Sequence, residues 1–152
     1  MTIRKVAAGE DIPYDLLLLA DPSRELINTY INVGEVYVME LENNIIAAYV
    51  LVRNDTTVEI KNIAVRVDYQ GQGIGKLLLN DAVQRATAMG CKSICIGTGN
   101  SSIAQLYLYQ RQGFEITGIR KDFFTTNYKD PIYENDILCK HMIMLERKLG
   151  EI

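Results

Sequence analysis

At 152 residues with 48% apolar and 23% charged residues, the chain suits one folded domain spanning residues 1–152 and is unlike a disordered protein. Its formal net charge of −3 argues against nucleic acid as the main partner, because nucleic-acid binders usually carry a concentrated basic excess. No apolar run approaches the roughly 20 residues that span a bilayer, and the N-terminus lacks a signal-peptide core, so we expect a cytoplasmic protein without a membrane partner.

The first half of the chain predicts one strand, two helices and an antiparallel meander of three strands. In chain order these are residues 2–7 (strand), 14–20 and 24–33 (helices), and 35–41, 45–53 and 58–65 (strands). Ser23 is a suitable N-cap for the second helix, and Gly34 follows as a stop. Glu42-Asn43-Asn44 supplies the first hairpin turn of the meander.

The second half alternates helices and strands. The predicted elements are a helix over residues 75–89, a strand over 92–96, a turn over 97–100, a helix from Ser101 or Ser102 to about Gln112, strands over 115–120 and 137–145, and between these strands a polar and aromatic loop over 122–136. Apolar residues recur at spacing four at Ile74, Leu78, Ala82 and Ala86, which indicates a helix with one buried face. The order β-α-α-β-β-β-α-β-α-β-β predicts an α/β fold.

Three alternating glycines, Gly71, Gly73 and Gly75, lie between the third meander strand and the following helix. Because glycine has no Cβ, main-chain N–H groups can turn inward and approach a ligand closely. The first helical turn adds unpaired donors and the positive end of the helix dipole. This segment therefore predicts a binding site for a phosphate or pyrophosphate group.

Two common nucleotide motifs do not fit this loop. A P-loop requires glycine where the chain has Gln70, and Ser or Thr where it has Leu77. The dinucleotide fingerprint requires a third glycine where the chain has Lys76.

The loop does resemble the pyrophosphate loop of the GNAT acetyltransferases, whose pattern is Q/R-x-x-G-x-G/A. It reads Gln70-Gly71-Gln72-Gly73-Ile74-Gly75, follows the strand signature Ile63-Ala64-Val65, and precedes an in-register Leu108-Tyr109-x-x-x-Gly113-Phe114 box. The order of elements resembles the same fold over most of the chain. The resemblance implies a mixed, mostly antiparallel central sheet with helices on both faces and one splayed pair of strands.

The resemblance also implies an activity: transfer of an acetyl group from acetyl-CoA, as co-substrate and without a metal, to a primary amine that attacks the thioester directly. The strand before the loop would bulge, its backbone would pair with the pantetheine arm, and the Val65 N–H would point at the thioester oxygen. The implied cofactor-binding residues are Ile63, Ala64, Val65, Gln70, Gly71, Gln72, Gly73, Ile74, Gly75, Lys76, Asn100 and Ser102. Lys76 is equally consistent with a solvated lysine, and Asn100 with a turn residue. Many relatives carry asparagine where this chain has Ser102.

The catalytic residues implied by the resemblance are Tyr109 and Glu59. Tyr109 lies where many relatives carry the tyrosine that protonates the departing thiolate, whereas Tyr107 should face elsewhere and suits packing under the sheet. Glu59 is the acidic residue that matches the family's general base, and simple alternation places it on one face with Lys61 and Ile63. A plain ion pair between Glu59 and Lys61 is the alternative. His141 is expected on a late strand in a structural role, with general-base catalysis as the alternative, since histidine suits that work near neutral pH.

The acceptor amine, a small molecule or a peptide, is expected between residues 24–34 and the loop 122–136. This loop interleaves aromatic residues with acids, which suits a cation; they are Phe123, Phe124, Tyr128 and Tyr133 with Asp122, Asp130, Glu134 and Asp136. Packing of these aromatics on the sheet is the alternative. Two other functions remain open: a coenzyme A-binding sensor or scaffold without turnover, and transfer of a longer acyl group. A homodimer also remains open.

Overall fold

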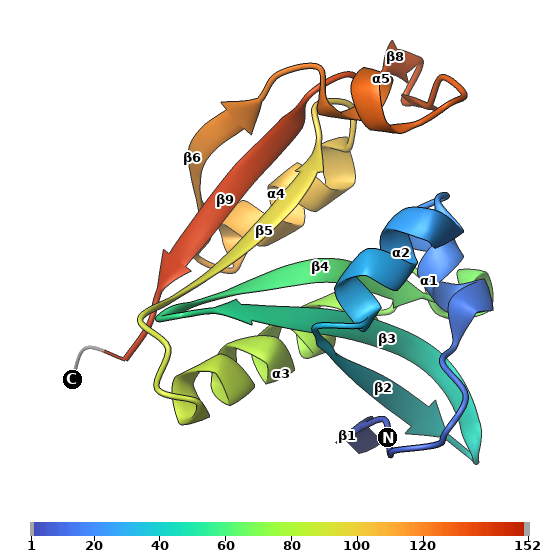
Figure 1. Cartoon of the computed structure of the whole chain (residues 1–152), viewed down its shortest axis with the longest axis vertical. Coiled ribbons are helices and arrows are strands. Elements are labelled where there is room, and N and C mark those ends of the chain that lie inside the picture. Colours follow the sequence, from blue (N-terminus) through green and yellow to red (C-terminus); the bar gives the residue numbers. More distant parts are fainter. Residues whose placement is uncertain (1, 151–152) are drawn as a thin grey trace.

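The computed structural model of the protein describes residues 2–150, which form a seven-stranded mixed sheet in the order β1-β2-β3-β4-β5-β9-β6 and a separate β7-β8 hairpin. Neighbouring strands are antiparallel except β4 and β5, so the predicted mixed, mostly antiparallel sheet is confirmed. The strands are β1 (Thr2–Lys5), β2 (Glu35–Leu41), β3 (Asn44–Asn54), β4 (Thr57–Val65), β5 (Ser93–Gly99), β6 (Glu115–Arg120), β7 (Tyr133–Glu134), β8 (Ile137–Leu138) and β9 (Met142–Lys148) (Figure 1).

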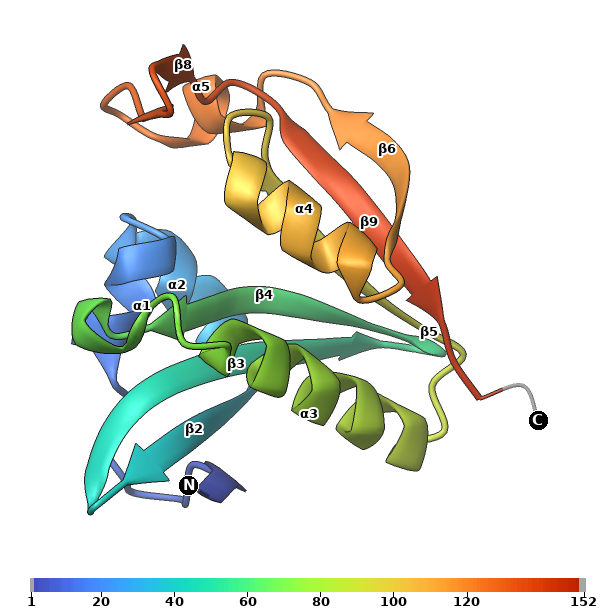
Figure 2. The ribbon, with the colours of Figure 1, turned by 180° about the vertical axis from the view of Figure 1, so that it is seen from behind.

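Helices cover both faces of the sheet, as predicted. They are α1 (Tyr14–Ala20), α2 (Arg24–Ile31), α3 (Ile74–Ala88), α4 (Ile103–Arg111) and α5 (Phe123–Asn127), with a short 3₁₀ turn, η1 (Val67–Tyr69). Helices α1 and α2 bury one apolar cluster against β2–β4, and α3 and α4 bury a larger one on the opposite face (Figure 2). No helix within residues 2–150 is long and apolar enough to cross a membrane.

Local signals in the sequence explain several helix ends. The Ser23 hydroxyl accepts a hydrogen bond from the Leu26 N–H at 3.1 Å and caps α2, as predicted. Helix α4 ends in a Schellman motif: Gly113 has φ +89°, and the Phe114 N–H donates to Tyr109 O at 3.0 Å. The apolar face of α3 is buried, with Leu78 fully inaccessible to solvent. The helical spacing of the apolar residues therefore correctly predicted which face of α3 is buried.

The two halves of the sheet part between β4 and β5. The two strands pair only from Thr57 with Ser93 to Ile60 with Ile96, and beyond these residues they diverge (Figure 1). Strand β4 also carries a β-bulge, because Leu51 of β3 lies opposite Ile60 while Val50 lies opposite Asn62. The expected bulge and splayed strand pair are thus both present.

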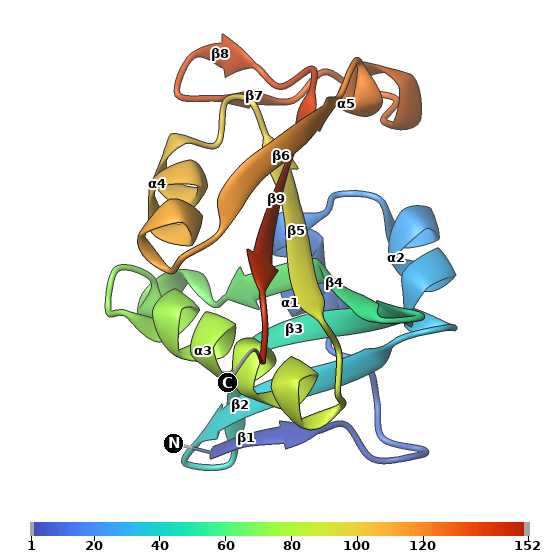
Figure 3. The ribbon, with the colours of Figure 1, turned by 90° about the vertical axis from the view of Figure 1, so that its left-hand side faces the viewer.

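Two predictions for the C-terminal part are wrong. Residues 97–99 continue β5 rather than form a turn: a Cβ on Gly97 would meet Met142 Sδ of β9 at 2.6 Å, so glycine provides close strand contact there. The strand predicted over 137–145 is split in two. Asn135 and Asp136, both with positive φ, form the tight turn of the β7-β8 hairpin, and the long strand β9 begins only at Met142 (Figure 3).

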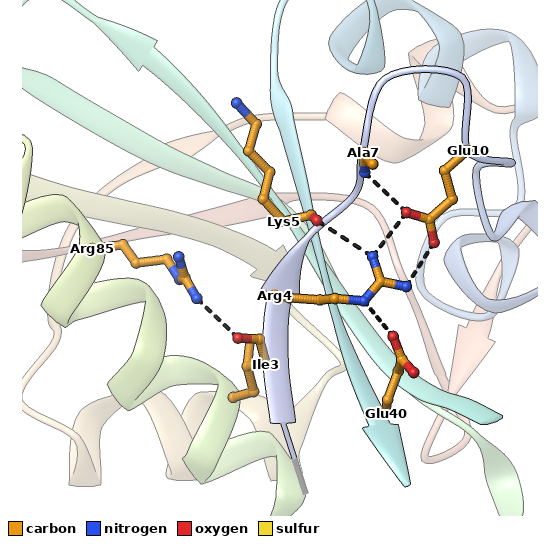
Figure 4. A network of polar contacts seen from close by, with 7 residues as sticks. All are labelled: Ile3, Arg4, Lys5, Ala7, Glu10, Glu40 and Arg85. Atoms are coloured by element: carbon orange, nitrogen blue, oxygen red, sulfur yellow. Dashed lines mark hydrogen bonds and ion pairs between the residues drawn. The ribbon is translucent and has the colours of Figure 1, made fainter. Parts of the chain in front are cut away.

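A polar network fixes the N-terminal strand to the rest of the sheet. The Arg4 guanidinium donates to both carboxylate oxygens of Glu10 at 2.8 Å and also bonds to Glu40 of β2 (Figure 4). From the other side, Arg85 of α3 donates to Ile3 O at 3.1 Å. These bonds hold β1 at the sheet edge far from the parted strands.

Candidate functional site

The glycine-rich loop presents a run of main-chain donors in front of α3. Gly71 and Gly73 have φ values of +77° and +81°, and Gly73 is the N-cap of α3. Within residues 2–150, no backbone acceptor is found for the N–H groups of residues 71–76. A Cβ at Gly71 or Gly73 would meet no atom within 4 Å, so the space beside the loop is open. Main-chain N–H groups without a backbone acceptor at a helix start suit a phosphate group.

Gln70 differs from the rest of the predicted loop because its backbone N–H is used within the protein. Its backbone N–H donates to Val67 O at 3.3 Å, closing η1. Its side-chain Nε2 donates to Val65 O at 3.0 Å. Gln70 therefore shapes the loop and ties it to the end of β4, and the prediction that it binds the cofactor is wrong for its backbone N–H. Lys76 is exposed in the first turn of α3.

The open edge of β4 presents the Val65 N–H. On the paired edge, the Arg66 N–H donates to Ile46 O of β3 at 2.8 Å. The carbonyl of that same planar peptide, Val65 O, must point the opposite way, as its bond to Gln70 confirms. Because the N–H and C=O of one strand residue share a direction, the Val65 N–H also faces the open edge. This is the orientation that the family resemblance implies.

The bulge in β4 changes which side chains share a face. Val58, Ile60 and Ile63 pack in the cluster below α3, whereas Asn62 bonds to groups of α1 and α2 on the other face. The expectation that Ile63 shares a face with Glu59 is therefore wrong, since the extra residue at Lys61 reverses the alternation. Glu59 and Lys61 form an ion pair at 3.6 Å. That contact leaves the Glu59 side chain one-fifth exposed, opposite Cys95 in the paired stretch just before β4 and β5 part.

A cleft of about 520 Å³ lies between the parted strands and extends toward α2 and α5. Several predicted site residues line it together: Glu59, Ile63, Ser102 and Tyr109. Ala64, Val65, Asn100 and the loop of residues 70–76 are not among its lining residues. The cleft thus joins both proposed catalytic side chains to the predicted acceptor walls.

Tyr109 is 4% exposed, and its ring packs 6.4 Å from that of Phe114 while it lines the cleft. Burial raises the pKa of its phenol well above the ordinary value, so the hydroxyl is protonated at neutral pH. No hydrogen-bond partner of this hydroxyl is found among the described residues. Tyr107 is 68% exposed, so the expectation that it packs under the sheet is wrong, although it does face away from Tyr109.

The residues at the start of α4 are held by the C-terminal loop. Asn100 bonds Leu138 O, Lys140 N and His141 N with its side-chain amide, which favours the interpretation of this residue as a turn residue. The Ser102 hydroxyl donates to Glu134 Oε1 at 3.0 Å. His141 precedes β9 rather than lying on it, and its Nδ1 accepts from the Asp122 N–H at 2.8 Å, a structural contact.

The expected acceptor walls meet at the outer end of the cleft. Three of the predicted loop aromatics line it, and they pack on one another; they are Phe123, Phe124 and Tyr128. Tyr133 does not line the cleft and is exposed, and of the four acids named in the loop only Glu134 reaches the lining. Part of this loop also forms α5, a helix that was not predicted from the sequence.

Two polar residues of this end were not identified from the sequence. Asp21, at the corner between α1 and α2, is 8% exposed and accepts hydrogen bonds from Tyr30 and Tyr128 at 2.9 and 2.8 Å. Asn62 of β4 is 4% exposed and donates to Tyr30 Oη and Leu17 O, each at 3.0 Å. Both line the cleft. Asn62 stands at one of the alternate strand positions that otherwise carry apolar residues, and this was the available signal for it; no local signal marked Asp21.

Comparisons with known proteins agree with this geometry. The family model of the acetyltransferase (GNAT) domain matches residues 32–116. The uncharacterized N-acetyltransferase YvbK of Bacillus subtilis (strain 168) is 47% identical over 145 residues, covering 93% of this chain and 94% of that protein. The crystal structure of a GNAT family acetyltransferase from Elizabethkingia anophelis with acetyl-CoA bound is 55% identical with a TM-score of 0.96, covering 97% of each chain. A Bacillus subtilis acetyltransferase in complex with CoA is 44% identical with a TM-score of 0.90, covering 97% of this chain and 98% of that one.

Proposed function

Because the chain belongs to the GNAT family of N-acetyltransferases, we propose that it moves the acetyl group of acetyl-CoA to a primary amine by direct attack within a ternary complex. The observation that carries the proposal is the row of unpaired amides over residues 71–76, placed beside a strand edge that has lost its neighbour. Acetyl-CoA as donor is supported by the relatives of known structure that hold acetyl-CoA or CoA.

In this proposal the donor is held mainly by the main chain. The amides of residues 71–76 and the dipole of α3 bind the pyrophosphate, and exposed Lys76 adds positive charge near it. The edge of β4 at Ile63–Val65, left free by β5, pairs with the pantetheine arm as a further strand would. Ser102 contributes from the start of α4, and Asn100 acts indirectly by holding the adjoining loop.

The chemistry requires four functions. The acceptor must lose a proton, its nitrogen must form a bond to the thioester carbon, the oxyanion must be stabilised, and the sulfur must leave as a thiol. Glu59 accepts the ammonium proton through water, since it lies at the strand opening but is paired with Lys61. The Val65 N–H donates to the oxyanion. Tyr109, whose phenol remains protonated, gives its proton to the sulfur as the carbon–sulfur bond breaks, and water carries the second proton of the bonded nitrogen back to the tyrosine.

The test is release of free CoA thiol from acetyl-CoA in the presence of a panel of primary amines. We expect acceptor-dependent release with formation of the N-acetyl product, and faster turnover with acetyl-CoA than with succinyl-CoA. Saturable binding of acetyl-CoA without release for any amine would instead indicate a sensor or scaffold. Faster turnover with succinyl-CoA would show that the protein transfers a longer acyl group.

A further inference from the structure

Asp21 is a carboxylate placed in the wall of the cleft with most of its hydrogen-bonding capacity already used. Its Oδ1 accepts from Tyr128 Oη at 2.8 Å and from the Ser23 N–H at 3.1 Å, and its Oδ2 accepts from Tyr30 Oη at 2.9 Å. An ionised carboxylate offers about four acceptor positions, so one position on Oδ2 remains. Burial raises the pKa of both phenols, which therefore stay protonated as donors.

No cationic side chain of the described residues pairs with this buried carboxylate. Among the ion pairs formed within residues 2–150, none involves Asp21, and its three donors are neutral groups. Burying an ionised group without a counter-charge is costly, so the arrangement is that of a site that receives a cation from outside. A second group beside it also lacks a partner: the Asn62 Oδ1, in a side chain only 4% exposed, accepts no hydrogen bond from the described residues.

The charge of the whole cleft points the same way. Its lining contains three carboxylates and one lysine; they are Asp21, Glu59, Glu134 and Lys61. Lys61 is paired with Glu59, and Glu134 accepts only the neutral Ser102 hydroxyl. Two carboxylates of the cleft therefore have no cationic partner within the described part of the chain. A ligand with more than one positive charge fits such a lining better than a monocation does.

Asp21 does not suit the nitrogen that reacts. An ammonium group that is ion-paired with a buried carboxylate holds its proton more tightly, and a protonated nitrogen has no lone pair with which to attack a thioester. The favourable occupant of Asp21 is consequently a second cationic group of the acceptor, one that stays charged throughout the reaction.

The same residue limits the length of the acceptor. Tyr128 belongs to the segment after α5 on the C-terminal half of the sheet, whereas Asp21 joins α1 to α2 on the other half. Their hydrogen bond therefore bridges the parted halves across the cleft. An acceptor held against Asp21 must fit between this bridge and the thioester, which favours a short molecule over a protein terminus.

Building on the proposed function, we propose that Asp21 binds a second, non-reacting cationic group of the acceptor, and that the acceptor is a small diamine. The probe set is three amines of equal chain length: 1,4-diaminobutane with two positive charges, butylamine with one, and 4-aminobutanoate with no net charge. Binding of each to the protein in the presence of CoA is measured by titration calorimetry, so that no turnover is needed.

We expect the diamine to bind on the order of tenfold more tightly than butylamine, and 4-aminobutanoate to bind more weakly still. Asp21→Asn should remove the advantage of the diamine while its affinity for butylamine changes less than about twofold. Glu25→Gln is the matched control: it removes an exposed carboxylate from the first turn of α2, outside the cleft, and should keep the full preference. An unchanged affinity of Asp21→Asn for CoA confirms that the variant is folded.

Equal affinities for diamine and monoamine in the wild-type protein overturn the inference without any variant, as does a diamine preference that persists in Asp21→Asn. Binding of none of the three amines overturns it too. The thiol-release assay on the same amines separates this result from the proposed function. Selective binding of the diamine without thiol release for any amine would support the Asp21 site and reject transferase activity. Thiol release with equal preference for monoamine and diamine would support transferase activity and reject the Asp21 site.

Discussion

Substituting valine for Gly73 tests whether the loop amides bind the donor. Gly73 has φ +81°, and no atom lies within 4 Å of the position that a Cβ would take, so the variant suffers strain in the backbone but no collision within the protein. A residue with a Cβ costs about 1–2 kcal/mol in this left-handed region, against a total stability of about 5–15 kcal/mol for an ordinary domain. The protein should therefore fold, with its free energy of unfolding reduced by that amount.

The affinity for CoA should fall as well, by a similar or somewhat larger free energy than the stability. The valine side chain would take up the open space beside Gly73, which belongs to the run of residues 71–76 whose amides have no backbone acceptor among the described residues. Losing one hydrogen bond to a charged group, worth about 1.5–3 kcal/mol, weakens binding roughly 10- to 150-fold. Titration calorimetry with CoA measures the affinity, and urea unfolding measures the stability.

Gly90→Val provides the matched control. Gly90 has φ +78° and also meets nothing within 4 Å, but it follows the C-terminal end of α3. It should lose a similar amount of stability and keep wild-type affinity for CoA. Unchanged CoA affinity in Gly73→Val, or an equal loss in Gly90→Val, would refute the assignment of the loop.

Tyr109→Phe should lower turnover on the order of 100-fold at unchanged acetyl-CoA affinity, because only the proton donor is lost. Unaffected turnover would assign that role to another group. Tyr107→Phe, at an exposed position, is the control. Leu78→Ala should lower the free energy of unfolding, measured by urea titration, by about 2–5 kcal/mol, because it opens a cavity at a fully buried position. In the same assay Leu77→Ala, at an exposed position, should change it by less than about 0.5 kcal/mol. Bonds from Arg4 and the Ala7 N–H lower the pKa of Glu10 from 4.5 to about 2. Its contribution to stability is thus present above the unfolded-state pKa and lost as the pH falls toward 2, so the stability difference between wild type and Glu10→Gln should shrink between pH 5 and pH 2; a constant difference would contradict this.

The glycine loop and the core of α3 were predictable because their signals are local. Gly71 and Gly73 occupy positive φ, and this conformation is what makes glycine informative in a sequence. The burial of Leu78 follows directly from helical spacing. Where a residue type and a conformation are coupled within a few positions, the sequence alone was sufficient.

The bulge at Lys61 left no comparable trace. A strand with one extra residue shows the same alternating letters as a regular one, and only pairing with β3 reveals that Ile63 has changed face. The turn predicted at Gly97 was wrong for a related reason. Glycine is needed there because a Cβ would collide with Met142, which belongs to a strand far along the chain. The hydrogen bond between Asp21 and Tyr128 joins positions 107 apart, and no local pattern encodes such a contact.

The parting of β4 from β5 has a consequence for how the protein can diversify. In the proposed mode of binding, the donor is read by peptide groups of Ile63–Val65 and residues 71–76, and peptide groups are the same whatever side chains they carry. Apart from the glycines of the loop, donor recognition therefore constrains backbone shape more than residue identity. The proposed acceptor, by contrast, would meet side chains such as Asp21 and Tyr128, whose chemistry changes with each substitution. In this proposal, substitutions in the cleft would change which amine is accepted while leaving acetyl-CoA binding unaffected.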